Sequence, residues 1–143
     1  MKLEMTELLN EDQITLNDIK GALRITGTGH DAELYDILAS ARAYAESTTD
    51  TTIGQKKWRV TTEFEYDEDT LPRGPVSDLE EVDDDDFYIY EYTGGFEGGV
   101  LPADIKRLVL LICKRIYDMD DLSEDVNSNI TRLTQSITRQ PML

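Results

Sequence analysis

At 143 residues, the chain is long enough for one domain with a hydrophobic core, and its net charge of −16 makes it strongly acidic. Between Glu63 and Glu97, fourteen Asp or Glu residues stand against one Arg, and this surplus of negative charge disfavours specific nucleic-acid binding because it repels phosphate backbones. The longest apolar run, Leu108 to Cys113, is far shorter than the ~20 residues of a membrane span, so we expect neither a membrane contact nor a secretory leader.

The cysteine and histidine content excludes two further classes of protein. Cys113 is the only cysteine, so no disulfide forms within the chain, and a reducing compartment fits. His30 is the only histidine, and together these two residues are too few for the usual zinc sites. We therefore expect no metal and no cofactor.

The first half of the chain predicts two helices. Residues 1–12 carry scattered apolar residues among acids, which indicates a short helical turn or an ordered arm. Thr15 and Asp18 resemble a capping box at the start of a short helix over about 15–25. A second helix over about 31–48 follows from apolar residues at three- and four-residue steps: Leu34, Ile37, Leu38, Ala41, Tyr44 and Ala45.

The middle of the chain, over about 56–93, predicts a small β element. Trp58, Val60 and Thr62 alternate with polar residues, as in a half-buried strand. Leu79 and Val82 indicate the start of a second strand, and Phe87 to Thr93 a third. The acidic runs 67–69 and 83–86 fall in loops.

The longest helical pattern covers about 102–119 and predicts the core helix. Its apolar face is formed by Leu101, Ile105, Leu108, Val109, Ile112 and Ile116. The predicted fold is mostly α: a small helical bundle with an inserted small β-hairpin or meander and a C-terminal tail helix. We expect a connector domain over 1–120 and a tail over 121–143.

The tail carries a narrow apolar seam at steps of four, three and four residues, formed by Val126, Ile130, Leu133 and Ile137. A helix with so narrow a seam and many poor helix formers is marginal alone. Two interpretations remain open: the tail packs loosely on its own domain, or it becomes ordered against a partner during assembly.

No enzyme motif emerges from the sequence. The acidic runs lack the alternating ligands, central Gly and closing Glu of a calcium loop, and no carboxylate pair stands out for hydrolysis. His30 has no nucleophile near it in the sequence. The glycines from Gly94 to Gly99 lack the order of a phosphate-binding loop, and Glu97 would repel phosphate.

Five motifs in the same order resemble the head–tail connector (adaptor) proteins of tailed bacteriophages. The first helix reads Thr15 to Ile25, and the second reads Asp31, Leu34 and Leu38 followed by Ala41 to Glu46. The other three motifs are "Q-x-W-R" at Gln55 to Arg59 with one extra residue, "LPR-x-PV" at Leu71 to Val76, and "Y-x-G-F…LP-x-D-I-K" from Tyr92 into the core helix. Where many relatives have a longer β segment, this chain has a short acidic run.

The resemblance implies a non-catalytic structural protein of the virion neck, present in the host cytoplasm during assembly. It implies a twelve-fold ring of this chain that docks under the portal, contacts a downstream neck or tail-completion protein and extends the DNA channel. DNA would pass through without specific binding.

Two hypotheses connect this expectation to particular residues. The first places acidic loop residues on the channel wall, where negative charge keeps DNA from adhering; their alternative place is the outer surface. These residues are Asp67, Glu68, Asp69, Asp83, Asp84, Asp85 and Asp86. The second assigns Val126, Ile130, Leu133 and Ile137 to contact with the portal or a neighbouring subunit.

Two competing classes were weighed against the connector. A free-standing acidic protein that mimics nucleic acid would stay a monomer or dimer and bind a basic partner at low salt. A small hydrolase would need a catalytic constellation that the sequence lacks.

Overall fold

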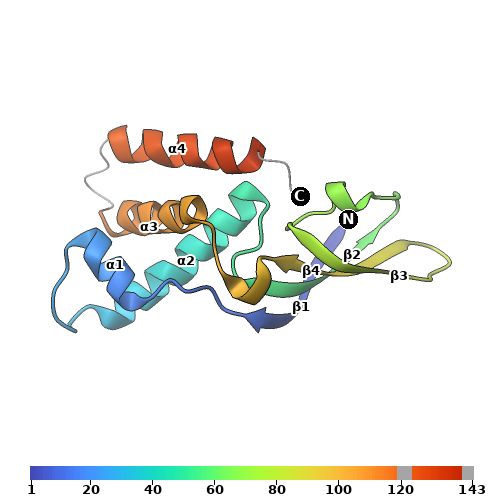
Figure 1. The fold of residues 1–143 in the computed structure, drawn as a ribbon, viewed down its shortest axis with the longest axis horizontal. Coiled ribbons are helices and arrows are strands. Elements are labelled where there is room, and N and C mark those ends of the chain that lie inside the picture. The colour runs from blue at the N-terminus through green and yellow to red at the C-terminus, as the bar shows by residue number, and fades with distance from the viewer. Residues whose placement is uncertain (119–123, 140–143) are drawn as a thin grey trace. The chain divides into compact units, whose positions relative to one another are not determined.

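The computed structural model describes residues 1–118 and 124–139, which form two compact units (Figure 1). The sheet unit comprises Met1–Asp12 and Asp50–Val100. The helical unit comprises Gln13–Thr49 and the described part of Leu101–Gln140. Each unit has its own hydrophobic core.

The sheet unit is built on four antiparallel strands: β1 (Lys2–Asn10), β2 (Gln55–Thr62), β3 (Val76–Val82) and β4 (Tyr88–Gly95). Their spatial order is β1-β2-β4-β3, so β2 and β4 are central and β1 and β3 form the edges. In the central pair, Trp58 lies opposite Tyr92 and Val60 lies opposite Tyr90. Such pairs of aromatic and β-branched residues stabilise neighbouring strands.

The two faces of this sheet differ in character because side chains alternate along each strand. One face carries the core of the unit, formed by Trp58, Val60, Leu71, Tyr90 and Tyr92. The opposite face is polar. There Arg59 pairs with Glu91 at 2.7 Å, and Lys57 pairs with Glu7 at 3.4 Å.

The segment 71–75 is fastened along one side of the sheet by its backbone. The carbonyls of residues 72–75 each accept a hydrogen bond, in chain order from Tyr92 Oη (2.5 Å), Thr52 Oγ1 (2.5 Å), Thr52 N (2.9 Å) and Gly95 N (3.0 Å). Thr52 Oγ1 also accepts from Trp58 Nε1 at 3.0 Å. Burial, together with the nearby Asp50 carboxylate, raises the pKa of Tyr92 far above its usual value, so its hydroxyl keeps the proton that it donates.

The helical unit contains four helices: α1 (Leu16–Leu23), α2 (Asp31–Thr49), α3 (Ala103–Tyr117) and α4 (Glu124–Arg139). α3 packs against each of the other three. Its buried residues Leu108, Val109 and Ile112 form the centre of this core. At the start of α1, Asp18 N donates to Thr15 Oγ1 (3.2 Å) and Thr15 N donates to Asp18 Oδ2 (2.9 Å), which is the expected capping box.

The expectation of a mostly helical bundle with a small β insertion is wrong. The chain is a mixed α/β protein, and its described part contains a four-stranded antiparallel sheet and four helices. Two short 3-10 turns, η1 (Glu68–Thr70) and η2 (Glu97–Gly99), also lie in the sheet unit. The core helix α3 therefore organises only the helical unit, since the sheet unit has a separate core around Trp58 and Tyr90.

Much of the error comes from the first strand. Residues 1–12 were expected to form a helical turn or an arm, but β1 pairs with β2, with Leu3 opposite Val60. This pairing joins segments about fifty residues apart, so the local periodicity of β1 carries no sign of it. β3 is equally hard to recognise, because polar residues fill most of its positions.

Candidate assembly surfaces

We examined the described residues first for a metal site and a membrane span. They contain no group of three or more His, Cys, Asp or Glu side chains arranged to hold a metal ion. Among the described helices, none has the length and apolar character needed to cross a bilayer. The functional features that remain are on the surface.

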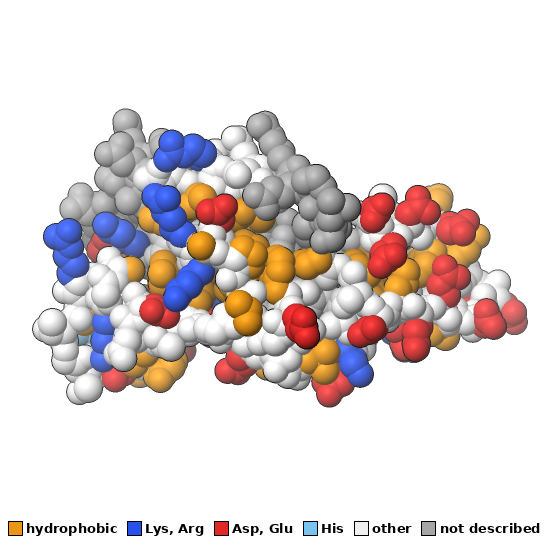
Figure 2. Space-filling view, in the orientation of Figure 1, with side chains coloured by type: hydrophobic (Ala, Val, Ile, Leu, Met, Phe, Trp, Pro, Cys, Tyr) orange, Lys and Arg blue, Asp and Glu red, His pale blue; other side chains and the backbone are white. Residues whose placement is uncertain are grey.

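The first surface is acidic and belongs to the sheet unit. Figure 2 shows Asp and Glu side chains gathered over this unit on the face in view. The runs 67–69 and 83–86, both predicted as candidate channel residues, lie here: the first at η1 and the second in the turn that joins β3 to β4. All seven side chains are exposed, and none forms an ion pair with another described residue.

The β3–β4 turn holds its acids in a defined arrangement. Asp84 Oδ1 accepts hydrogen bonds from Asp86 N (2.9 Å) and Phe87 N (3.1 Å), so this carboxylate stabilises the turn itself. Beside these acids, Phe87 and Tyr88 are 45% and 46% exposed. The turn thus presents carboxylates and aromatic rings together, a combination that the sequence analysis did not single out.

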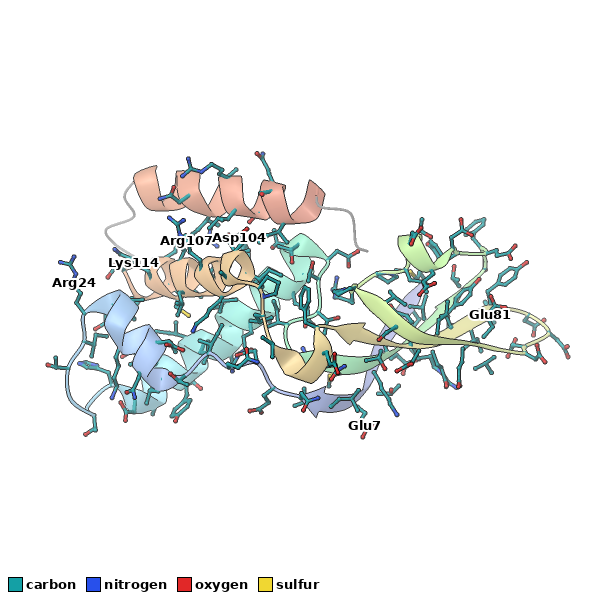
Figure 3. The ribbon with its side chains drawn as sticks, viewed as in Figure 1. Glu7, Arg24, Glu81, Asp104, Arg107 and Lys114 are labelled. Atoms are coloured by element: carbon teal, nitrogen blue, oxygen red, sulfur yellow. The ribbon has the colours of Figure 1, made fainter. Side chains whose placement is uncertain are left out.

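The second surface carries cations and belongs to the helical unit. Arg24 lies at the C-cap of α1, and Arg107 and Lys114 lie on α3 (Figure 3). Within the part of the chain that the structure describes, no ion pair or side-chain hydrogen bond engages any of the three. Figure 2 shows Lys and Arg side chains over the helices on the face in view. The sequence did not predict this surface, because the net charge of −16 is a sum over the whole chain and does not show where cations gather.

Other cations of the helical unit have partners within it. Lys106 pairs with Asp18 at 3.4 Å, and the Arg115 guanidinium lies 4.8 Å from the centre of the Tyr44 ring. A backbone hydrogen bond at Thr15 lowers the pKa of Asp18, and Lys106 contributes in the same direction. A hydrogen bond with Arg115 lowers the pKa of Tyr44. These cations stabilise the unit, whereas Arg24, Arg107 and Lys114 have no partner among its described residues.

The tail seam lies on helix α4, which packs against α3 and also touches α2. Ile130 and Ile137 are buried there, and Leu133 is half-buried. The backbone of Val126 belongs to α4, but its side chain lies outside the described residues. Two members of the seam therefore have partners in their own chain.

Together these features describe a two-unit protein whose candidate sites are charged surfaces. Residues 13–137 match the family of phage gp6-like head-tail connector proteins. The chain belongs to this family, which makes it a structural connector protein. A search of the curated proteins gives no match.

Two solved structures share the fold. One is a chain of the virion of the native gene transfer agent (GTA) particle, with a TM-score of 0.67 and 20% identity over 93% of this chain and 95% of that chain. The other belongs to the neck of the empty GTA particle computed with C6 symmetry, with a TM-score of 0.63 and 19% identity over the same shares. At this identity the likeness shows a common fold, which spans both units of the chain.

Proposed function

We propose that this connector protein forms a ring under the portal, joins the phage head to the tail and extends the DNA channel. The family match over residues 13–137 carries the proposal. The acidic surface supports it, because a channel wall that repels phosphates lets DNA slide past without adhering. The protein would act without catalysis, in the virion neck, after assembly in the host cytoplasm.

The proposed ring has twelve copies, with the portal on one side and a downstream neck or tail-completion protein on the other. One structure of similar fold is part of a neck computed with C6 symmetry. A twelve-fold ring contains a six-fold axis, so the two symmetries are compatible. For the channel wall, the candidates remain the acidic runs 67–69 and 83–86.

The seam of α4 is the candidate contact with the portal or a neighbouring subunit. Because Ile130 and Ile137 are buried in the helical unit, a contact through them requires α4 to leave this position or to occupy the same position on a neighbour. Leu133 is only half-buried, and it can contact a partner while α4 stays in place.

The test is the mass of the protein in solution, measured by light scattering alone and after mixing with the portal of the same phage. A ring-sized assembly in either sample is the expected result, and electron microscopy of that sample should show a central channel. A protein that stays a monomer in both samples contradicts the proposal.

A nucleic-acid mimic is the second candidate, and the concentration of negative charge between Glu63 and Glu97 favours it. Such a protein binds a basic DNA enzyme as a monomer or dimer, with an affinity that falls as salt rises. The same mass measurement, repeated with a basic DNA-binding enzyme in place of the portal, separates the two functions.

A further inference from the structure

Ring assembly poses an electrostatic problem for this chain. Each copy carries a net charge of −16, and neighbouring copies in a ring repel one another unless opposite charges meet at their contacts. The charge is unevenly divided: the acids concentrate in the sheet unit, whereas the helical unit carries cations that have no partner among the described residues. One copy therefore carries both halves of an attractive contact.

The first half is the hairpin end, which we define as Asp83–Asp86 with Phe87 and Tyr88. Tyr88 lies opposite Thr62 at the last pair of the β2–β4 ladder. It continues the face that carries Tyr90 and Tyr92, but it is 46% exposed whereas Tyr90 is 1% exposed. The aromatic face of the sheet is thus buried at Tyr90 but exposed at Tyr88. Exposed rings of this kind, rimmed by charge, are typical of a protein contact.

The second half is the cation surface, which we define as Arg24, Arg107 and Lys114. Arg107 and Lys114 are seven residues apart on α3, which places them on the same side of the helix about two turns from each other. Asp104, one turn before Arg107, is also exposed but forms no ion pair with a described residue. The two cations of α3 thus have no partner among the described residues of the unit; Arg107 is exposed and Lys114 is half-buried.

We propose that the hairpin end of one copy docks on the cation surface of the next copy. Carboxylates of the hairpin end pair with the Arg and Lys side chains, and the rings of Phe87 and Tyr88 lie against guanidinium groups, which are attracted to aromatic faces. The two surfaces differ, so the contact is head-to-tail, and a contact of this type closes into a ring when the rotation between copies closes. This inference rests on the proposed ring and identifies the residues that hold it together. It assigns the run 83–86 to the subunit contact, so the run 67–69 is the candidate that it leaves for the channel wall.

Stoichiometry favours a second copy over another basic partner. Every copy brings one hairpin end and one cation surface, so a closed ring satisfies all of them with none left over. A different basic protein would cover the hairpin end but leave Arg24, Arg107 and Lys114 without partners.

The test reverses the charges of the hairpin end in one variant and those of the cation surface in another. The hairpin variant is Asp83→Lys with Asp85→Lys, which spares Asp84 and its turn-forming hydrogen bonds. The helix variant is Arg107→Glu with Lys114→Glu. The matched control, Glu63→Lys with Glu65→Lys, makes the same change in net charge at two exposed positions after β2. Each protein is assayed by light scattering under the condition in which the natural chain assembles, alone or with portal, and its thermal melt confirms folding.

Each variant alone should need a protein concentration at least tenfold higher than the natural chain to assemble. An equimolar mixture of the two should regain it, because each reversed surface meets its complement on the other protein, and a single chain with all four substitutions should also regain it. The control should assemble like the natural chain.

Three results would each overturn this contact without contradicting the proposed ring. Both variants assemble normally, the mixture of the two variants fails to assemble, or the control variant also fails to assemble. If the natural chain forms no assembly in either condition, the proposed function falls and this contact falls with it.

Discussion

Gly94 lies where β4 approaches the 71–75 segment most closely. A Cβ atom built at this position would meet the Arg73 carbonyl oxygen, the Thr52 hydroxyl and the Trp58 ring, all at distances too short for a real side chain. Two of these three groups also take part in the hydrogen bonds that fasten the segment. The first glycine of the run 94–99 therefore serves close packing in the sheet unit.

Replacing Gly94 by Ala should lower the free energy of unfolding by about 1–3 kcal/mol, because backbone and ring atoms must move to admit the methyl group. Urea denaturation followed by the fluorescence of Trp58, the only tryptophan, measures this in the sheet unit. Gly21→Ala is the control. It lies in the middle of α1 with no atom near its Cβ position, and it should raise stability by about 0.5–1 kcal/mol by circular dichroism. Equal effects at the two sites would contradict the packing argument.

Cys113 is fully buried on α3, and this burial raises the pKa of its thiol to about 11 from 9.0. The thiolate is the reactive form, so the native protein should react with a thiol reagent at pH 8 far more slowly than the protein in urea. The unfolded thiol ionises first as pH rises, so its contribution to stability is complete below about pH 9 and is lost towards pH 11. Fast labelling of the native protein at pH 8 would show that this core opens readily.

At the scale of elements, the seam of α4 combines packing within the helical unit with a proposed contact to a partner. Ile130 and Ile137 stabilise the helical unit, as the packing of α4 on α3 shows. Leu133 is half-buried and keeps part of its surface for a partner. A substitution at Ile130 would therefore confuse folding with docking, and Leu133 is the better position for a test.

Leu133→Asp should weaken retention of the chain by the portal about tenfold or more, which corresponds to about 1.4 kcal/mol. The reason is that a charge replaces an apolar side chain at the proposed contact. Co-sedimentation with portal measures the effect, and Thr131→Asp, an exposed neighbour on α4, is the control of equal added charge. Normal portal binding by a folded Leu133→Asp protein would remove the seam from the docking surface.

At the scale of the whole molecule, the separation of charge matters more than its total. The sheet unit supplies the acidic surface, and the helical unit supplies the cation surface. A ring that turns acidic side chains towards its channel repels DNA there, while opposite charges at the subunit contacts offset the repulsion between copies.

Reversal of charge at the proposed channel wall should make DNA adhere. The assembled natural chain should not shift double-stranded DNA in a gel at about 50 mM salt. An assembly with Asp67, Glu68 and Asp69 replaced by Lys should retain DNA, with an affinity that falls steeply as salt rises, because counterions are released from the phosphates. Failure of the reversed ring to bind DNA would place these acids away from the channel.

The sequence alone determined the helices, the central strands and the family. Apolar residues three and four apart predict α2 and α3, and alternation predicts β2, because a single element shows its own period. Tertiary structure decided the rest: β1 became a strand by pairing with β2, which no local pattern records. Likewise, Ile130 and Ile137 pack within their own chain, while Arg24, Arg107 and Lys114 have no partner among the residues that the structure describes. The physical reason is that these contacts join residues far apart in the sequence. Each segment carries its own periodicity, but only the folded chain shows which groups have met and which are still exposed.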